Sequence, residues 1–251
     1  MQRKAGTLTL ATLFLLPSIP FAAAYPPPPG PPPPEAGIQF RLGLFNPTGD
    51  SDFWRDTEGT FTLRASDFDD LMLGVSFVRP VSNEVEIGFN LDVFQETVGS
   101  SVRPALDPFD EPDLHDTRLT ILPLTADVRF LPGGRYRVRP GGRMIIKPAF
   151  YVGAGIGFNF WEYEEYGRFL DLSIVPPEPI PGFLAFRDDG VAFEVHGLAG
   201  VELPLGRTTN LLFELRHSIS NDDLGGDFSD LPFRELDLGG TAVFGGMAFR
   251  F

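Results

Sequence analysis

Apolar and polar residues alternate along most of the chain, in segments of about ten residues that begin after residue 35. In the clearest segment, 85–93, every second residue is apolar, and the residues between are Glu86, Gly88, Asn90 and Asp92. Successive side chains of a β-strand point to opposite faces, so this pattern predicts a strand with one apolar and one polar face. No stretch after residue 35 keeps the period of a helix.

Eight such segments are present, at about 38–44, 73–77, 85–93, 122–130, 148–160, 193–203, 211–216 and 243–251. An even number of strands lets the first and the last pair antiparallel and close the sheet, and a closed sheet leaves no backbone edge unsatisfied in hydrocarbon. We therefore predict an all-β fold for residues 36–251: an eight-stranded antiparallel up-and-down transmembrane β-barrel. A soluble lipocalin-like barrel is the alternative, and it would reverse the pattern, with apolar residues inside.

The connections between these segments alternate in length and in charge. Long connections at 45–70, 95–116, 162–190 and 218–235 are rich in Asp and Glu, and the first has seven acids against two bases. The shorter connections carry Arg79, Arg135, Arg137, Arg139, Arg143 and Arg207. Transmembrane barrels have short periplasmic turns and long extracellular loops. The sequence therefore predicts acidic extracellular loops and a basic periplasmic rim.

The predicted inward positions carry both signs of charge. They include Arg41, Glu86, Asp92, Asp127, Arg129, Lys147, Glu194, Glu202, Glu214, Arg216 and Arg250. An eight-stranded barrel is only wide enough for its own side chains, and an unpaired ion away from water costs several kcal/mol. We therefore predict a salt-bridged interior without a pore. A narrow channel for ions or small apolar solutes stays open as the alternative.

The N-terminus has the pattern of a secretory signal peptide, predicted over 1–24. Arg3 and Lys4 precede an apolar run, which ends in the small residues Ala22, Ala23 and Ala24. The proline-rich stretch 25–35 should adopt an extended polyproline II conformation. We interpret it as a stiff spacer, with a docking ligand for an envelope partner as the alternative.

Composition excludes several classes of protein. The formal net charge of −14 argues against a nucleic-acid partner, because phosphate binding needs basic patches. The chain has no Cys, so it has no disulfides and no thiolate metal site. No cofactor motif is present, and we predict no cofactor.

Two stretches give the chain a resemblance to a known family. The glycine-rich YVGAGIG at 151–157 and the terminal GGMAFRF, together with the alternating strands, resemble the OmpA/OmpX/OmpW-like outer-membrane β-barrel superfamily, over 36–251. Members end in an aromatic residue with apolar residues at alternate preceding positions, and Met247, Phe249 and Phe251 fit that pattern. The resemblance implies an assembly signal read by the barrel-assembly machinery, and an outer-membrane place among lipid and lipopolysaccharide. It favours a structural or surface-interaction role, with an OmpW-like narrow channel as the alternative.

One stretch carries a possible enzyme site. The sequence ELRHSISNDDLGG resembles the HxSN stretch of outer-membrane lipid A deacylases, which use a His-Ser-Glu site. Aligning Ser220 and Asn221 with that motif places Ser218, not His217, at the position of the base, and nothing singles out Glu235 as the acid. We therefore predict that the protein is not an enzyme.

Metal ions and membrane anchoring are two further possibilities. His196, beside Glu194, is expected to be a hydrogen-bonded interior histidine and not a metal ligand. The acidic runs SDFDD and DPFDEPD could attract divalent cations, although solvated loops are favoured. Aromatic residues near the ends of strands often form a girdle at the membrane interface. We assign that role to Trp54, Trp161, Tyr163 and Tyr166.

Overall fold

The computed structural model describes residues 36–106, 112–140, 144–171, 178–180, 182–232 and 234–251. The predicted signal peptide (1–24) and proline-rich spacer (25–35) lie outside these residues. So do Asp107, Asp110 and Glu111 of the second long connection, and Arg143 of the predicted basic rim.

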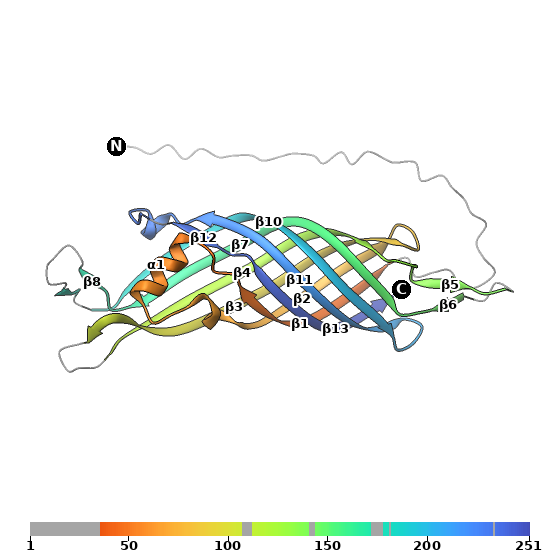
Figure 1. The fold of residues 1–251 in the computed structure, drawn as a ribbon, viewed down its shortest axis with the longest axis horizontal. Helices are drawn as coiled ribbons and strands as arrows, with labels where there is room; N and C mark the ends of the chain where they lie inside the picture. Colours follow the sequence, from red (N-terminus) through yellow and green to blue (C-terminus); the bar gives the residue numbers. More distant parts are fainter. Residues whose placement is uncertain (1–35, 107–111, 141–143, 172–177, 181, 233) are drawn as a thin grey trace.

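Eight long strands close into a barrel (Figure 1). They are β1 (Gly37–Pro47), β2 (Asp70–Pro80), β3 (Val85–Leu106), β4 (Pro112–Phe130), β7 (Ala149–Gly167), β10 (Leu184–Pro204), β11 (Thr209–Asp223) and β13 (Gly240–Arg250). Each pairs antiparallel with its neighbours in chain order, and β13 pairs with β1. The predicted eight-stranded, antiparallel, up-and-down barrel is confirmed.

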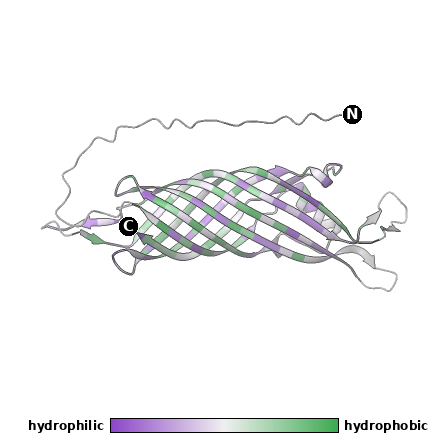
Figure 2. Ribbon diagram, turned by 180° about the vertical axis from the view of Figure 1, so that it is seen from behind, coloured by the Kyte–Doolittle hydropathy of each residue, from purple (hydrophilic) through white to green (hydrophobic). Residues whose placement is uncertain are grey.

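The apolar residues of these strands face outward. Phe89 is 55% exposed and Val152 is 51% exposed, whereas Glu86 and Arg250 are buried in the interior. The alternation is visible along the strands in Figure 2. This orientation is the reverse of a lipocalin-like barrel, so that alternative is wrong.

The barrel has two different ends. At the short-turn end, β2 joins β3 through 81–84 and β10 joins β11 through 205–208, while the β4–β7 connection contains the hairpin β5 (Tyr136–Val138) and β6 (Met144–Ile146). At the long-loop end lie the remaining minor elements, β8 (Leu170–Asp171), β9 (Glu178–Pro179), η2 (Gly226–Phe228) and β12 (Glu235–Asp237). The predicted short turns are present, but the predicted alternation in length is wrong at two connections, because β3 and β4 are separated only by 107–111 whereas β4 and β7 are separated by 131–148.

Much of what was predicted as long loop is strand. The β3–β4 pairing continues through Ser101 and Leu114, and β7 pairs with β10 as far as Gly167 and Leu184. The alternation of apolar residues stops near residues 93 and 160, but the backbone ladder does not. We call the exposed apolar residues on the outer face of the strands the apolar band. Beyond this band a strand needs no apolar face, so the alternation in the sequence underestimates the length of the strand. The sheet consequently extends past the exposed apolar residues at the long-loop end.

The first long connection, 48–69, folds into a compact segment that we call the plug. It contains the helix α1 (Asp52–Thr60) and the 3-10 helix η1 (Ala65–Phe68). Ser51 caps α1 by accepting a hydrogen bond from the Trp54 backbone N–H. Within the described ranges, no helix is long and apolar enough to cross a membrane.

Candidate functional site: a barrel interior closed in two layers

The middle of the barrel interior is held by two arginines that share two carboxylates. Arg41 on β1 donates to Asp92 Oδ1 and to Glu214 Oε1, both at 2.7 Å. Arg216 on β11 donates to Asp92 Oδ2 at 2.7 Å and to Glu214 Oε1 at 3.0 Å. All four side chains occupy inward positions of their strands, so the pleat alone aims them at one another.

A third arginine extends this cluster across the barrel. The Nε of Arg129 donates to Asp127 Oδ1 at 2.8 Å, and its terminal nitrogen lies 3.6 Å from Glu214 Oε2. The same guanidinium donates to Gln39 Oε1 at 2.9 Å. Arg129 thereby links β4 to β1 and β11, which lie on other sides of the barrel.

The short-turn end of the interior is closed by Arg135 and Arg250. Arg135 binds Glu86 at 2.7 Å and Glu202 at 2.6 Å, and Arg250 pairs with the same two carboxylates. The sequence placed Arg135 on the basic rim, and this assignment is wrong. Asn83 accepts the backbone N–H groups of Arg135 and Tyr136, which turns the Arg135 side chain back into the barrel.

These ion pairs balance. The arginines are Arg41, Arg129, Arg135, Arg216 and Arg250, and the carboxylates are Glu86, Asp92, Asp127, Glu202 and Glu214. All ten residues are buried. A buried ion is tolerated when it is both paired and hydrogen-bonded, and here each one has an opposite charge within reach.

Two of the predicted interior charges lie elsewhere or have other partners. Lys147 precedes the start of β7, and its ammonium donates to the Gly133 carbonyl oxygen in the β4–β7 connection. Strand alternation does not extend into a connection, so its assignment to the interior network is wrong. Glu194 is inside the barrel, but its partner is His196 Nδ1 at 3.0 Å. The structure thus shows His196 hydrogen-bonded within the interior.

Neutral side chains complete the network, and sequence reasoning did not select them. The Tyr151 hydroxyl donates to Glu214 Oε2 at 2.9 Å, and Asn210 donates to Glu202 Oε2 at 2.8 Å. Asn90 donates to Asp127 Oδ2 at 2.7 Å. These residues sit at the same inward positions as the charges, so the signal was available in the alternation. Charge alone does not identify these neutral residues, whereas their inward position in the alternation does.

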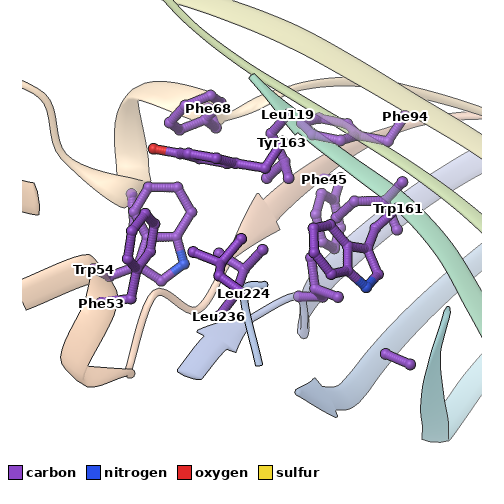
Figure 3. Packing of buried hydrophobic residues seen from close by; sticks show 14 of the residues in the cluster. Phe45, Phe53, Trp54, Phe68, Phe94, Leu119, Trp161, Tyr163, Leu224 and Leu236 are labelled. Carbon is purple, nitrogen blue, oxygen red and sulfur yellow. The ribbon is translucent and has the colours of Figure 1, made fainter. Parts of the chain in front are cut away.

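The long-loop half of the interior is apolar, because the plug fills it. Trp54 and Phe68 of the plug are fully buried, and their rings lie 5.4 Å apart. Phe53 of α1 contacts Tyr163 of β7 edge to face, with ring centroids 5.2 Å apart. Figure 3 shows these rings and Trp161 grouped inside the barrel wall.

The predicted aromatic girdle is therefore wrong, because three of its four residues lie inside the barrel and the fourth, Tyr166, lies six residues beyond Phe160, the last apolar residue on the outer face of β7. Trp54, Trp161 and Tyr163 are buried inside, at 0%, 4% and 0% exposure, and only Tyr166 is exposed. On β7 the odd-numbered residues face inward, as Tyr151 does, so Trp161 and Tyr163 follow the strand's own parity. Trp54 faces the interior because the plug folds into the barrel mouth.

Hydrogen bonds anchor the plug to the wall. The Trp54 Nε1–H donates to the Asp237 carbonyl oxygen at 3.0 Å, and the Asp50 N–H donates to Asp237 Oδ2 at 3.0 Å. On the other side, the Thr62 N–H donates to the Ser101 carbonyl oxygen at 2.9 Å. The plug is thus fixed to both β12 and β3.

A small cavity separates the apolar layer from the charged layer. Its volume is about 20 Å³, and its lining includes Phe45, Met72, Asn159, Glu194 and Arg216. A cavity of this size holds one water molecule, not a solute.

The stretch that resembles a deacylase motif lies on β11, and its residues are divided between the two faces of that strand. His217 is exposed on the outer face, where its Nδ1 lies 3.0 Å from Thr241 Oγ1, whereas Ser220 is buried on the inner face. Asn221 donates to Glu235 at 2.7 Å. Because alternate residues of β11 face opposite sides, His217 cannot serve as a base for Ser218 or Ser220.

The described part of the chain contains no cluster of three or more His, Asp or Glu residues arranged to hold a metal ion. Part of the DPFDEPD run falls among residues that are not described. The SDFDD run is described, and there Asp67 caps η1 by accepting from the Arg64 N–H at 2.9 Å.

No family model matches the sequence, and no curated protein is significantly similar to it. Among solved structures, Neisserial surface protein A shares 10% identity with a TM-score of 0.44, covering 86% of this chain and 97% of that chain. The N-terminal β-barrel domain of Pseudomonas aeruginosa OprF shares 12% identity with a TM-score of 0.35, covering 87% and 98%. Ail, the attachment invasion locus protein of Yersinia pestis, shares 10% identity with a TM-score of 0.37, covering 86% and 97%. These values are too low to carry a functional argument, and the fold assignment rests on this chain's own strand pairing.

Proposed function

We propose that the protein is an integral outer-membrane β-barrel with a structural or surface-interaction role and a closed interior. The observation that carries this proposal is the division of side chains by the barrel wall. Outside lies a continuous belt of exposed apolar residues, and inside lies a balanced set of buried ion pairs. Water would penalise the first arrangement and hydrocarbon favours it.

The two ends of the barrel supply the orientation. Carboxylates dominate the long-loop end, and the short-turn end carries Arg79, Arg137, Arg139 and Arg207. We assign the long-loop end to the cell exterior and the short-turn end to the periplasm, in keeping with the usual arrangement of such barrels. Lipid and lipopolysaccharide would then surround the wall, and divalent cations could bridge the acidic exterior to lipopolysaccharide phosphates.

The terminal residues fit a role in assembly. Met247, Phe249 and Phe251 are 38%, 40% and 64% exposed on the outer face. An apolar, outward-facing last strand is accessible to a barrel-assembly machinery before the sheet closes onto β1. This placement supports their proposed role as an assembly signal.

The interior favours a closed barrel over a narrow channel. The charged layer occupies the short-turn half and the plug occupies the long-loop half, with a cavity of about 20 Å³ between them. A continuous water path would require both layers to open. We also propose that the barrel is not an enzyme, because His217 and Ser220 lie on opposite faces of β11.

Conductance in planar bilayers tests the closed interior. We expect the purified protein to insert without stepwise currents, and a variant lacking plug residues 50–67 to remain closed as well, because the ion-pair layer stays in place. Adding Arg135→Ala and Arg250→Ala to the plug deletion should still leave the barrel closed, because the Arg41–Asp92–Glu214–Arg216 cluster fills the middle of the interior. Stepwise currents from the wild-type barrel would contradict the proposal.

A further inference from the structure

Two aromatic rings lie exposed beyond the apolar band at the long-loop end. Tyr166 on β7 and Phe183, just before β10, stack with ring centroids 5.6 Å apart and planes 14° apart. They are 48% and 55% exposed, and the Arg168 guanidinium lies 5.5 Å from the Phe183 centroid. The two rings form one contiguous exposed apolar surface, and such surfaces on a folded protein can mark an interaction site.

The height of this pair places it outside the lipid. The apolar band on β7 ends at Phe160, and Tyr166 lies six residues further along the strand. At ~3.4 Å per residue this is roughly 20 Å of strand, or roughly 15 Å along the membrane normal for a strand tilted by about 40°. The polar headgroup layer is only about 5–7 Å thick on each side. The pair therefore lies at the level of the outer-leaflet saccharides.

The rings also face sideways. Tyr166 has the same strand parity as Phe158 and Phe160, so its side chain continues the outer wall of the barrel. Between Phe160 and Tyr166 the wall carries two exposed ion pairs, Arg187–Glu162 at 2.7 Å and Arg118–Glu164 at 3.0 Å. These pairs neutralise Glu162 and Glu164, while Asp116, opposite Tyr166 on β4, adds an exposed carboxylate beside the rings.

We infer that Tyr166 and Phe183 form a lateral binding site for the saccharide portion of the surrounding lipopolysaccharide. The inference rests on the proposed outer-membrane location. The C–H face of a sugar ring can pack on an aromatic ring and bury part of its exposed surface. The Tyr166 hydroxyl can donate to and accept from sugar hydroxyls.

A basic polypeptide is the competing partner, since carboxylates and aromatic rings together attract cations. The position of the rings favours the saccharide. They face along the membrane plane, where neighbouring glycolipids stand, and two nearby carboxylates, Glu164 and Glu162, are already paired with Arg118 and Arg187.

Binding of lipid-free core oligosaccharide to the barrel in phospholipid nanodiscs tests the inference. The proteins are the wild type, Tyr166→Ala, Phe183→Ala and, as a matched control, Leu231→Ala, which removes another exposed apolar side chain at the same end. Saturation-transfer NMR and calorimetry should show at least tenfold weaker binding for the two aromatic variants. The Leu231→Ala variant should bind as the wild type does.

Equal affinities for all four proteins would overturn the inference, and so would the absence of saccharide binding by the wild type. Polylysine binding that depends on Tyr166 and Phe183, without saccharide binding, would assign the rings to a basic polypeptide instead. Each protein is first checked for heat-modifiable migration. A correctly inserted barrel that binds no saccharide contradicts only this inference, whereas a failure of the wild type to insert contradicts the proposed function.

Discussion

The arginines inside the barrel are tied to specific partners and not to a diffuse charge field. Arg129 is fully buried, and its guanidinium is shared among Asp127, Gln39 and Asn90. When one member of a buried pair is removed, the other charge is left without compensation in a poorly solvated place. The cost of that loss exceeds what the intact pair contributes.

Replacing Arg129 by Met should therefore lower the free energy of unfolding by about 3–5 kcal/mol. Urea unfolding of the refolded barrel in detergent micelles measures this change. Arg79→Met is the control, because Arg79 is exposed at the short-turn end, and it should change stability by less than about 0.5 kcal/mol. Similar losses for both variants would contradict a paired interior.

A carboxyl pair at the long-loop end should show a measurable shift in titration. Glu96 lies three residues beyond the last apolar band residue of β3, and a hydrogen bond with Asp70 raises the pKa of Glu96 and lowers that of Asp70. A raised carboxyl pKa stabilises the fold below the ordinary Glu range, and this contribution is lost as the pH rises through the raised pKa. Carbon-13 carboxyl NMR should show Glu96 titrating above an ordinary glutamate, and Asp70→Asn should change that titration. An ordinary glutamate titration for Glu96 in the wild type would contradict the hydrogen bond between Glu96 and Asp70.

Strand parity explains which interior residues the sequence could reveal. Arg41, Asp92 and Glu214 lie within alternating segments, where the face of one residue fixes the face of the next. Arg135 and Lys147 lie in the β4–β7 connection, where no such rule applies, and both were assigned wrongly. The direction of Arg135 depends on tertiary contacts, namely the hydrogen bonds of its backbone to Asn83 and of its guanidinium to Glu86 and Glu202.

The plug is the element that most changes the interpretation of the interior. Helix α1 has nine residues, and an isolated helix of that length is marginal in water. Its stability must come from packing of Phe53, Trp54 and Thr57 against the barrel wall. A helix this short carries no long periodic pattern of apolar residues, which is why residues 45–70 are predicted from sequence as a long loop.

Trp54→Ala should loosen the plug while leaving the barrel closed. Truncating a buried aromatic side chain typically costs 3–5 kcal/mol, and here the hydrogen bond to the Asp237 carbonyl oxygen is lost as well. Hydrogen exchange should show faster exchange in residues 51–68, with little change in β1 and β13. Unchanged protection of the plug, or equal loss across the barrel strands, would contradict this account; Leu231→Ala is the surface control.

At the scale of the whole molecule, one wall separates three environments: an apolar exterior, a charged inner layer and an apolar inner layer. The strand number, their order and the outward apolar face followed from alternation, because the side-chain period of a strand is fixed by geometry. The lengths of the strands and the position of the plug inside the long-loop end could not be predicted from alternation, because they depend on backbone pairing and packing beyond the apolar band.

Lipid contact of the outward side chains is the central claim, and spin labelling measures it directly. The chain has no Cys, so single cysteines can be placed at Phe89, at Val152 and at the buried Ser76. In lipid bilayers, nitroxide labels at Phe89 and Val152 should collide readily with oxygen and poorly with an aqueous nickel chelate. A label at Ser76 should collide poorly with both reagents. Labels at Phe89 and Val152 that are reached by the aqueous reagent, or by neither reagent, would contradict a membrane-spanning barrel.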